Sequence, residues 1–273
     1  KSRIHATSQV PAKKTRFITY CQRIAAILLL PAIIAIVALM MKKDHQEPLI
    51  AYNEVTAPYG MVSSLTLPDS SKVWLNAGST LKYPTAFTSN VREVEMSGEA
   101  YFEVHADKEH PFIVNTGDLK VTATGTAFNI CSFAKAQEEV ITLVTGKVAV
   151  SQENNIKHLL PGQQLNYQRA SKSMEITDID TYKYISWKDG ILAFRDDPLK
   201  SIFNRLEQVY QVRFILKDTS INQFTYRATF KGETLDEILD YMGMSIPITF
   251  RTTETEKEGN DSINVRTIEV YKN

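Results

Sequence analysis

The stretch IAAILLLPAIIAIVALMM, from Ile24 to Met41, carries no charged residue. At about 1.5 Å per residue, a helix of this length reaches roughly 27 Å. The hydrocarbon core of a bilayer is about 30 Å thick, so the stretch is just long enough to span it. Pro31 lies in its middle, where a membrane helix tolerates it with a kink. The sequence therefore predicts one membrane span between a short amino end and a long carboxyl-terminal part.

The charges beside the span predict its orientation. No acidic residue precedes it, and six basic residues do: Lys1, Arg3, Lys13, Lys14, Arg16 and Arg23. Lys42 and Lys43 follow the span, and Asp44 and Glu47 come soon after them. The positive-inside rule then places the amino end in the cytoplasm and the rest outside. A cleaved signal peptide and a buried soluble helix are the alternatives, but a signal peptide has a shorter apolar region and a small-residue cleavage site.

Composition limits the classes of function. The chain has 273 residues and a formal net charge of +0. Without a basic excess, a nucleic-acid-binding surface is not expected. Cys21 and Cys131 fall on opposite sides of the predicted span, so we expect no disulfide between them, and neither has the spacing of a metal site. The first residue is Lys, which suggests a fragment or a processed product with a segment missing upstream.

Residues 55–170 read as strands separated by turns. Ala100, Phe102 and Val104 form one apolar face, while Tyr101 and Glu103 point the other way, which is typical of a half-buried strand. Turn residues recur at 68–71, 76–79, 97–98, 115–118, 145–146 and 161–162. The pattern predicts an all-β domain, either a sandwich or a rolled β structure, after a connector at 42–54.

Residues 189–273, after a linker at 171–188, have a different pattern. Asp197-Pro198 reads as a helix start with Asp197 as the cap, and Thr234 with Glu237 forms a capping box for a second helix. Each helix has an apolar stripe and is flanked by strand-like runs. The two strand–helix–strand units repeat at an offset of about 35 residues. This predicts an α+β domain with two helices packed on one small sheet.

Residue patterns give little support for catalysis. His105 and His110 are the only close pair of histidines, and no metal-ligand or phosphate-loop spacing occurs, so we expect no metal and no cofactor. Glu95, Glu99 and Glu103 could pair as carboxylates, but Glu99 follows Gly98 in an expected turn and Glu103 lies on an expected solvated strand face. We therefore do not expect an enzyme.

Several motifs occur in the order found in one known family. They are Tyr59-Gly60, LTLPD at 65–69, VWLNAGS at 73–79, SGEAYFEV at 97–104, PFIV at 111–114, GTAFNI at 125–130, PGQQ at 161–164 and WKDG at 187–190. Together they resemble the periplasmic domain of FecR-type regulators, which are membrane-anchored anti-sigma factors. The motif positions of structural interest are Trp74, Asn76, Gly98, Glu99, Phe102, Pro111, Phe112, Gly125, Thr126, Phe128, Pro161 and Gly162. Residues 194–250 are similar to the short signalling domain at the amino end of secretins and TonB-dependent transporters.

The resemblance implies an inner-membrane regulator with one span and periplasmic carboxyl-terminal domains. Its implied partners are the periplasmic signalling domain of an outer-membrane TonB-dependent transporter, an extracytoplasmic-function sigma factor and the lipid bilayer. The carboxyl-terminal module, marked by Phe194, Leu199, Phe230 and Leu235, is the expected docking element. The resemblance implies signalling by binding and conformational change or proteolysis, without catalysis by this chain.

The sequence departs from the family pattern in two places. Asp69-Ser70-Ser71 stands where the family usually has Asp-Gly-Ser, and a tight turn can still form with Ser. Only residues 1–23, an expected cytoplasmic stub, precede the span, too few for the family's helical sigma-binding domain. Two alternatives stay open: a membrane-tethered module that binds a glycan or another ligand, favoured if Trp74 or Trp187 is exposed, and a periplasmic hydrolase that uses Glu99 or Glu103.

Overall fold

The computed structural model describes residues 14–41, 51–258 and 263–273. They belong to two compact units, Lys1–Leu49 and Ile50–Asn273. In the first unit, α1 (Lys14–Met41) continues through Pro31 as one helix. Its exposed large side chains include Ile24, Ile27, Leu28, Leu29, Ile33, Ile34, Ile36 and Val37. No helix in the described part of the chain is long and apolar enough to cross a membrane. Stub residues 1–13 and connector residues 42–50 lie outside the described residues.

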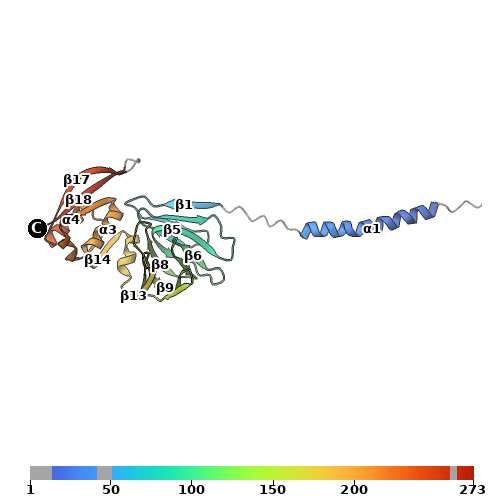
Figure 1. Cartoon of the computed structure of the whole chain (residues 1–273), viewed down its shortest axis with the longest axis horizontal. Coiled ribbons are helices and arrows are strands. Elements are labelled where there is room, and N and C mark those ends of the chain that lie inside the picture. The colour runs from blue at the N-terminus through green and yellow to red at the C-terminus, as the bar shows by residue number, and fades with distance from the viewer. Residues whose placement is uncertain (1–13, 42–50, 259–262) are drawn as a thin grey trace, which may run out of the picture. The chain divides into compact units, whose positions relative to one another are not determined.

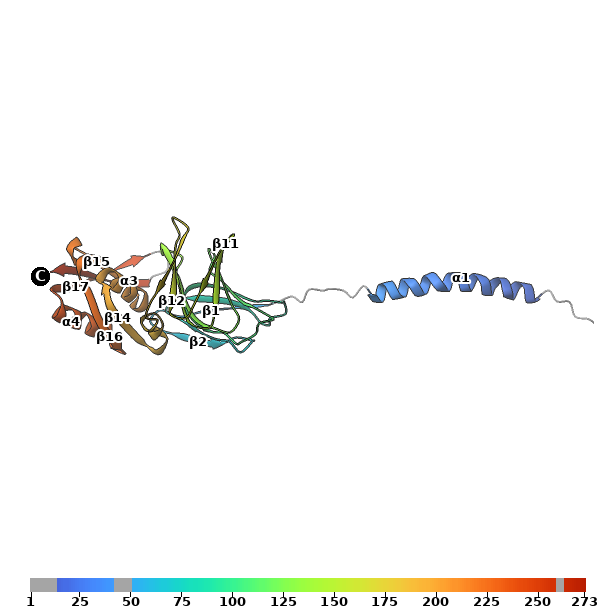
Figure 2. The ribbon, with the colours of Figure 1, turned by 90° about the horizontal axis from the view of Figure 1, so that it is seen from below.

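The second unit begins with two β-sheets that share one strand, β5 (Arg92–Glu103), and enclose the first hydrophobic core (Figures 1 and 2). The first sheet has the order β11 (Asn155–Leu159), β10 (Val148–Gln152), β7 (Lys120–Ala123), β6 (Phe112–Asn115), β5, β4 (Thr80–Pro84) and β1 (Tyr52–Thr56). The second sheet has the order β2 (Ser63–Thr66), β3 (Lys72–Leu75), β5, β8 (Ala127–Ser132), β9 (Glu138–Thr145), β12 (Gln163–Gln168) and β13 (Ser173–Asp178). The predicted all-β character of this part is confirmed. Strand β5 is parallel to β6 and antiparallel to its other neighbours.

Strand β5 passes from one sheet to the other at Gly98. Its first residues pair with β4 and β6, and from Gly98 onward it pairs with β8 and β3. Gly98 has a φ of +105°, which bends the strand. The predicted turn at 97–98 is therefore wrong, because this glycine serves a bend inside a strand of 12 residues. Glu99 lies within β5 and is buried, so the solvated position expected for it is also wrong.

Aromatic side chains from three strands form the centre of the first core. The Phe102 and Phe128 rings stack with their centroids 5.1 Å apart, and the Phe112 ring lies 6.1 Å from Phe102. Tyr101 points to the opposite face of β5, as predicted, yet it is only 4% exposed. Something other than solvent therefore covers the outer face of the second sheet.

The hairpin between β2 and β3 closes through a residue with a left-handed backbone. Ser70 has a φ of +69°, and its N–H donates to Leu67 O at 3.0 Å. The turn predicted for Asp69-Ser70-Ser71 thus forms, at a conformational cost that glycine avoids.

We expect Ser70→Gly to stabilise the protein by up to about 1 kcal/mol, because glycine adopts this conformation without steric strain. The Ser70 side chain is exposed and makes no hydrogen bond within the described residues, so little is lost. Urea denaturation of the full chain in detergent, followed by circular dichroism, measures the change. A midpoint below that of the wild type would contradict the argument.

The segment predicted as a linker, 171–188, is ordered secondary structure. It contains β13, the short helix α2 (Tyr182–Ile185) and most of the 3-10 helix η1 (Ser186–Asp189). Met174 and Ile176 of β13 pack against the first core. The prediction of a connector is wrong. Strand β13 lies at the edge of the sheet and packs only one of its faces against the core, so its sequence is mostly polar and reads as a connector. Strand β1, which pairs with β4, likewise occupies residues predicted as connector.

The second core lies between two helices and two small sheets. Strand β14 (Ile191–Pro198) pairs with β16 (Thr225–Lys231), and β18 (Ile263–Lys272) lies between β15 (Val212–Leu216) and β17 (Ile248–Glu258). Helices α3 (Leu199–Tyr210) and α4 (Leu235–Ser245) connect them, with the 3-10 helix η2 (Thr219–Gln223) after β15. The prediction of one sheet is wrong. Strands β14 and β16, which hold equivalent places in the two repeat units, pair with each other in one sheet. The equivalent strands β15 and β17 both flank β18 in the other sheet, and β18 lies outside the repeat.

The two helix starts differ from each other. The capping box of α4 is confirmed, since Thr234 and Glu237 bond each other's backbone N–H. Asp197 does not cap α3; the cap position is Pro198, without a side-chain bond. The Asp197 carboxylate instead accepts from Lys183 Nζ at 2.7 Å and from the Arg195 N–H at 2.8 Å. The predicted cap is wrong because these tertiary partners use both carboxylate oxygens.

Candidate functional site

A chain of buried polar groups joins the first core to η1. The Glu99 carboxylate accepts from Asn76 Nδ2 at 2.7 Å and from Asn129 Nδ2 at 3.0 Å. Asn129 Oδ1 accepts from Trp187 Nε1 at 3.2 Å, and Trp187 is 2% exposed. The two asparagine amides donate to the Glu99 carboxylate, and the Trp187 indole donates to Asn129. Because these polar side chains are hydrogen-bonded to one another, they can be buried on the outer face of the second sheet. We call Asn76, Glu99, Asn129 and Trp187 the inter-core network.

Lys188 extends this contact over two aromatic rings. Its Nζ lies 5.7 Å from the Trp74 ring centroid and 5.4 Å from that of Tyr101. Burial, together with the nearby carboxylates of Glu103 and Asp189, raises the pKa of Tyr101 to about 12. Trp74 is half-buried and Trp187 is buried, so neither offers the open stacking surface that would favour a glycan-binding module.

Replacing Trp187 by Phe should cost about 1–3 kcal/mol, because Asn129 Oδ1 loses its buried donor. Trp74→Phe is the matched control, since the Trp74 indole makes no hydrogen bond within the described residues. We expect the control to cost clearly less. Urea denaturation followed by far-ultraviolet circular dichroism measures both, and equal losses would contradict a specific role for the Trp187 bond.

The residues that could serve in catalysis do not come together in one site. Glu99 is held by two amides, whereas Glu103, His105 and His110 are exposed. Burial raises the pKa of the Cys131 thiol, and nearby Glu99 raises it further, so this free thiol is not activated. No group of three or more potential metal ligands occurs among the described residues.

The other motif positions support the first core or its turns. Gly125 has a φ of +130°, and a Cβ there would lie 2.8 Å from the Ala106 Cβ. Thr126 is buried, and the carbonyl of Pro111 accepts from the Arg92 N–H at 2.8 Å. Gly162, preceded by exposed Pro161, donates to Leu143 O and accepts from the Ile179 N–H. The surroundings of these motif positions therefore indicate a role in maintaining the fold.

The four residues that mark the expected docking module are core residues. Phe194, Leu199, Phe230 and Leu235 are 0–7% exposed and belong to the second hydrophobic core. Their side chains therefore cannot meet a partner in this conformation, and a partner would have to contact other residues of the module.

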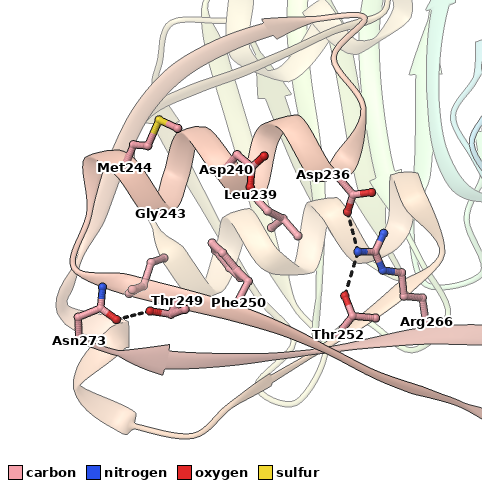
Figure 3. A pocket seen from close by; sticks show the side chains of 11 residues that line it. Asp236, Leu239, Asp240, Gly243, Met244, Thr249, Phe250, Thr252, Arg266 and Asn273 are labelled. Carbon is pink, nitrogen blue, oxygen red and sulfur yellow. Dashed lines mark hydrogen bonds and ion pairs between the residues drawn. The ribbon is translucent and has the colours of Figure 1, made fainter.

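The second core does have a groove at its surface, between α4 and the edge strand β17 (Figure 3). It encloses about 480 Å³. Leu239 and Phe250 lie between the helix and the strand, and Met244, which is 83% exposed, projects at one end. Strand β17 pairs only with β18 among the described strands, so its outer edge is unpaired. The groove thus combines a few apolar side chains with polar ones and lies beside a free strand edge.

The acidic and basic residues that line the groove do not neutralise one another completely. Arg266 Nη2 donates to Asp236 Oδ1 at 2.6 Å and to Thr252 Oγ1 at 2.9 Å (Figure 3). This hydrogen bond lowers the pKa of the Asp236 carboxyl. Asp240 also lines the groove, is exposed, and has no ion pair within the described residues. The rim therefore carries one uncompensated negative charge.

Sequence patterns did not identify this groove. Met244 lies outside the apolar stripe of α4, which is Leu235, Ile238, Leu239 and Met242. It is 83% exposed and lines the groove. The available signal was a large apolar residue outside the buried stripe of an amphipathic helix. Such a residue indicates a groove only when the neighbouring edge strand is known.

A free strand edge beside a groove is a surface on which an extended segment of another protein can add a strand. Two family models match the chain: FecR protein at residues 53–155, and FecR, C-terminal, at residues 191–258. A search of curated proteins finds no match.

Solved structures agree with these matches. Two crystal structures of a candidate anti-sigma factor from Parabacteroides distasonis ATCC 8503, at 1.65 Å and 2.50 Å resolution, are each 30% identical with a TM-score of 0.69. The alignments cover 81% and 82% of this chain and 99% and 100% of those chains. The chain belongs to the FecR family of anti-sigma regulators.

Proposed function

We propose that the chain receives a signal from an outer-membrane TonB-dependent transporter and passes it to an extracytoplasmic-function sigma factor. The observation that carries the receiving step is the unpaired edge of β17 beside the α4 groove. A strand of the transporter's periplasmic signalling domain would extend the β15–β18–β17 sheet and lay side chains into the groove. Main-chain hydrogen bonds would supply affinity, and the groove would supply specificity.

We further propose that residues 24–41 anchor the protein in the inner membrane, with the amino end cytoplasmic and the rest periplasmic. The uncharged sequence and the exposed apolar side chains of α1 support this, since such a surface is unfavourable in water. Ala26, Leu30 and the last four residues of the stretch have side chains outside the described set. In this proposal 55–170 and 189–273 act as two periplasmic domains, and the sigma factor binds on the cytoplasmic side.

Binding of the full chain in nanodiscs to purified signalling domains of TonB-dependent transporters from the same organism tests the receiving step. We expect Met244→Asp to weaken binding by about tenfold or more, because a charge would replace the exposed apolar side chain at the end of the groove. Ile156→Asp is the control, since Ile156 is 57% exposed on β11 of the first core. If no signalling domain binds, the transporter proposal fails; if Met244→Asp binds normally, the groove is not the contact.

A further inference from the structure

A second cavity lies between the outer face of the second sheet and the second core. It encloses about 260 Å³. Strands β9 and β12 form one wall, and α2, β14 and α3 form the others. Its polar lining includes Gln164, Asn166, Lys183, Ser201 and Arg205. The cavity is thus bounded by both cores and lies on the same face of the second sheet as the inter-core network.

Arg205 is the unusual residue of this cavity. Its Nε and Nη2 atoms are buried and have no hydrogen-bond partner within the described residues. No carboxylate of the described residues lies within ion-pair distance of its guanidinium either. Arg205 as a whole is partly exposed, but buried N–H groups without a partner are unfavourable, and those of native proteins normally have one. The two unpartnered N–H groups therefore offer donors to a negatively charged partner.

Two of the other charged groups around the cavity form an ion pair. Lys183 Nζ bonds Asp197 Oδ1 at 2.7 Å, and the second oxygen of Asp197 accepts from the Arg195 N–H. Glu138 forms no ion pair within the described residues, but it is exposed and accepts from Gln168 Nε2 at 2.8 Å, so its carboxylate is solvated. Arg205 is consequently the charged residue of this lining that has buried N–H groups without a partner in the described part of the chain.

We propose that this cavity binds a small monocarboxylate whose carboxylate pairs with the Arg205 guanidinium. The planar fork of arginine matches two carboxylate oxygens, and Ser201 and Asn166 offer further hydrogen bonds. A doubly charged anion such as phosphate fits less well, because the unpaired carboxylate of Glu138 also lines the cavity and would repel it more strongly than a single charge. The ligand would touch both cores and hold them together.

Thermal unfolding of the full chain in detergent tests the proposal, with sodium acetate or lactate replacing sodium chloride at constant ionic strength. A ligand that binds only the folded state raises the melting temperature. We expect a rise of a few degrees with acetate or lactate, a smaller rise with phosphate, and no rise in Arg205→Gln. Lys200→Gln is the matched control, because it removes an exposed charge from the same helix and should leave the rise intact.

Arg205→Gln should itself be at least as stable as the wild type in chloride, since it removes buried N–H groups that have no partner. Should that variant fail to fold, Ser201→Phe fills the cavity from an exposed position and should also abolish the rise. The proposal is overturned if the wild type shows no rise, if the rise persists in Arg205→Gln or Ser201→Phe, or if phosphate stabilises more than acetate.

Discussion

Gly98→Ala is expected to lower the free energy of unfolding by about 4 kcal/mol or more, enough to prevent folding in most conditions. Gly98 has a φ of +105°, which an L-residue adopts only with strain. A Cβ at this position would also lie 2.4 Å from Ser79 Oγ and 2.7 Å from Ser79 Cα. Ser79 is fully buried and its hydroxyl accepts from the Glu99 N–H at 2.7 Å, so it cannot move away freely.

Gly117→Ala separates the two contributions to this loss. Gly117 has a φ of +97°, close to that of Gly98, but a Cβ there would meet nothing within 4 Å. It should therefore cost only the backbone strain, about 1–2 kcal/mol. Soluble yield and urea denaturation of both variants in the full chain measure the difference. If the two variants lose equal stability, the close packing of Ser79 against the bend is unimportant.

Asp69→Ala is expected to lower the free energy of unfolding by about 3–5 kcal/mol, because it leaves a buried cation without its counter-charge. Arg92 Nη1 donates to Asp69 Oδ2 at 2.6 Å, and the two side chains are 4% and 10% exposed. The same carboxylate accepts from the N–H and the hydroxyl of Ser71. The remaining side-chain hydrogen bonds of Arg92 are to the backbone carbonyls of His105, Asp107 and His110, and its guanidinium lies over the Phe112 ring; none of these replaces a negative charge.

An exposed ion pair of the same unit provides the control. Lys82 Nζ lies 3.2 Å from Glu95 Oε2, and the two side chains are 43% and 58% exposed. Glu95→Ala should cost less than about 1 kcal/mol, because solvent screens the pair and hydrates the remaining lysine. Circular dichroism of both variants during urea titration compares the two losses. A loss for Asp69→Ala no larger than that for Glu95→Ala would show that Arg92 finds other compensation.

Local patterns predicted what local interactions determine. The Thr234–Glu237 capping box and the apolar stripes of α3 and α4 involve residues within one or two helical turns, so their spacing in the sequence is their spacing in space. The alternation around Phe102 likewise predicted the strand, but not the burial of Tyr101 on its other face. The family assignment followed from ordered motifs, and both family models and solved structures confirm it.

Positions that depend on distant neighbours were predicted wrongly or not at all. Gly98 reads as a turn until its two sets of partner strands are known. Glu99 reads as solvated until Asn76, Asn129 and Trp187 surround its carboxylate. Asp197 reads as a helix cap until Lys183 takes its carboxylate. In each case the residue type permits two environments, and a contact remote in sequence selects one.

By itself the sequence determined the uncharged stretch from Ile24 to Met41, the β-rich and helical regions, and the family, because composition, periodicity and motif order are properties of the chain. Only the tertiary structure decided that the second core has two sheets, that β17 has a free edge beside α4, and that two buried N–H groups of Arg205 have no partner among the described residues. Strand pairing and burial are set by residues far apart in the chain, and that is why the candidate sites appear only in the fold.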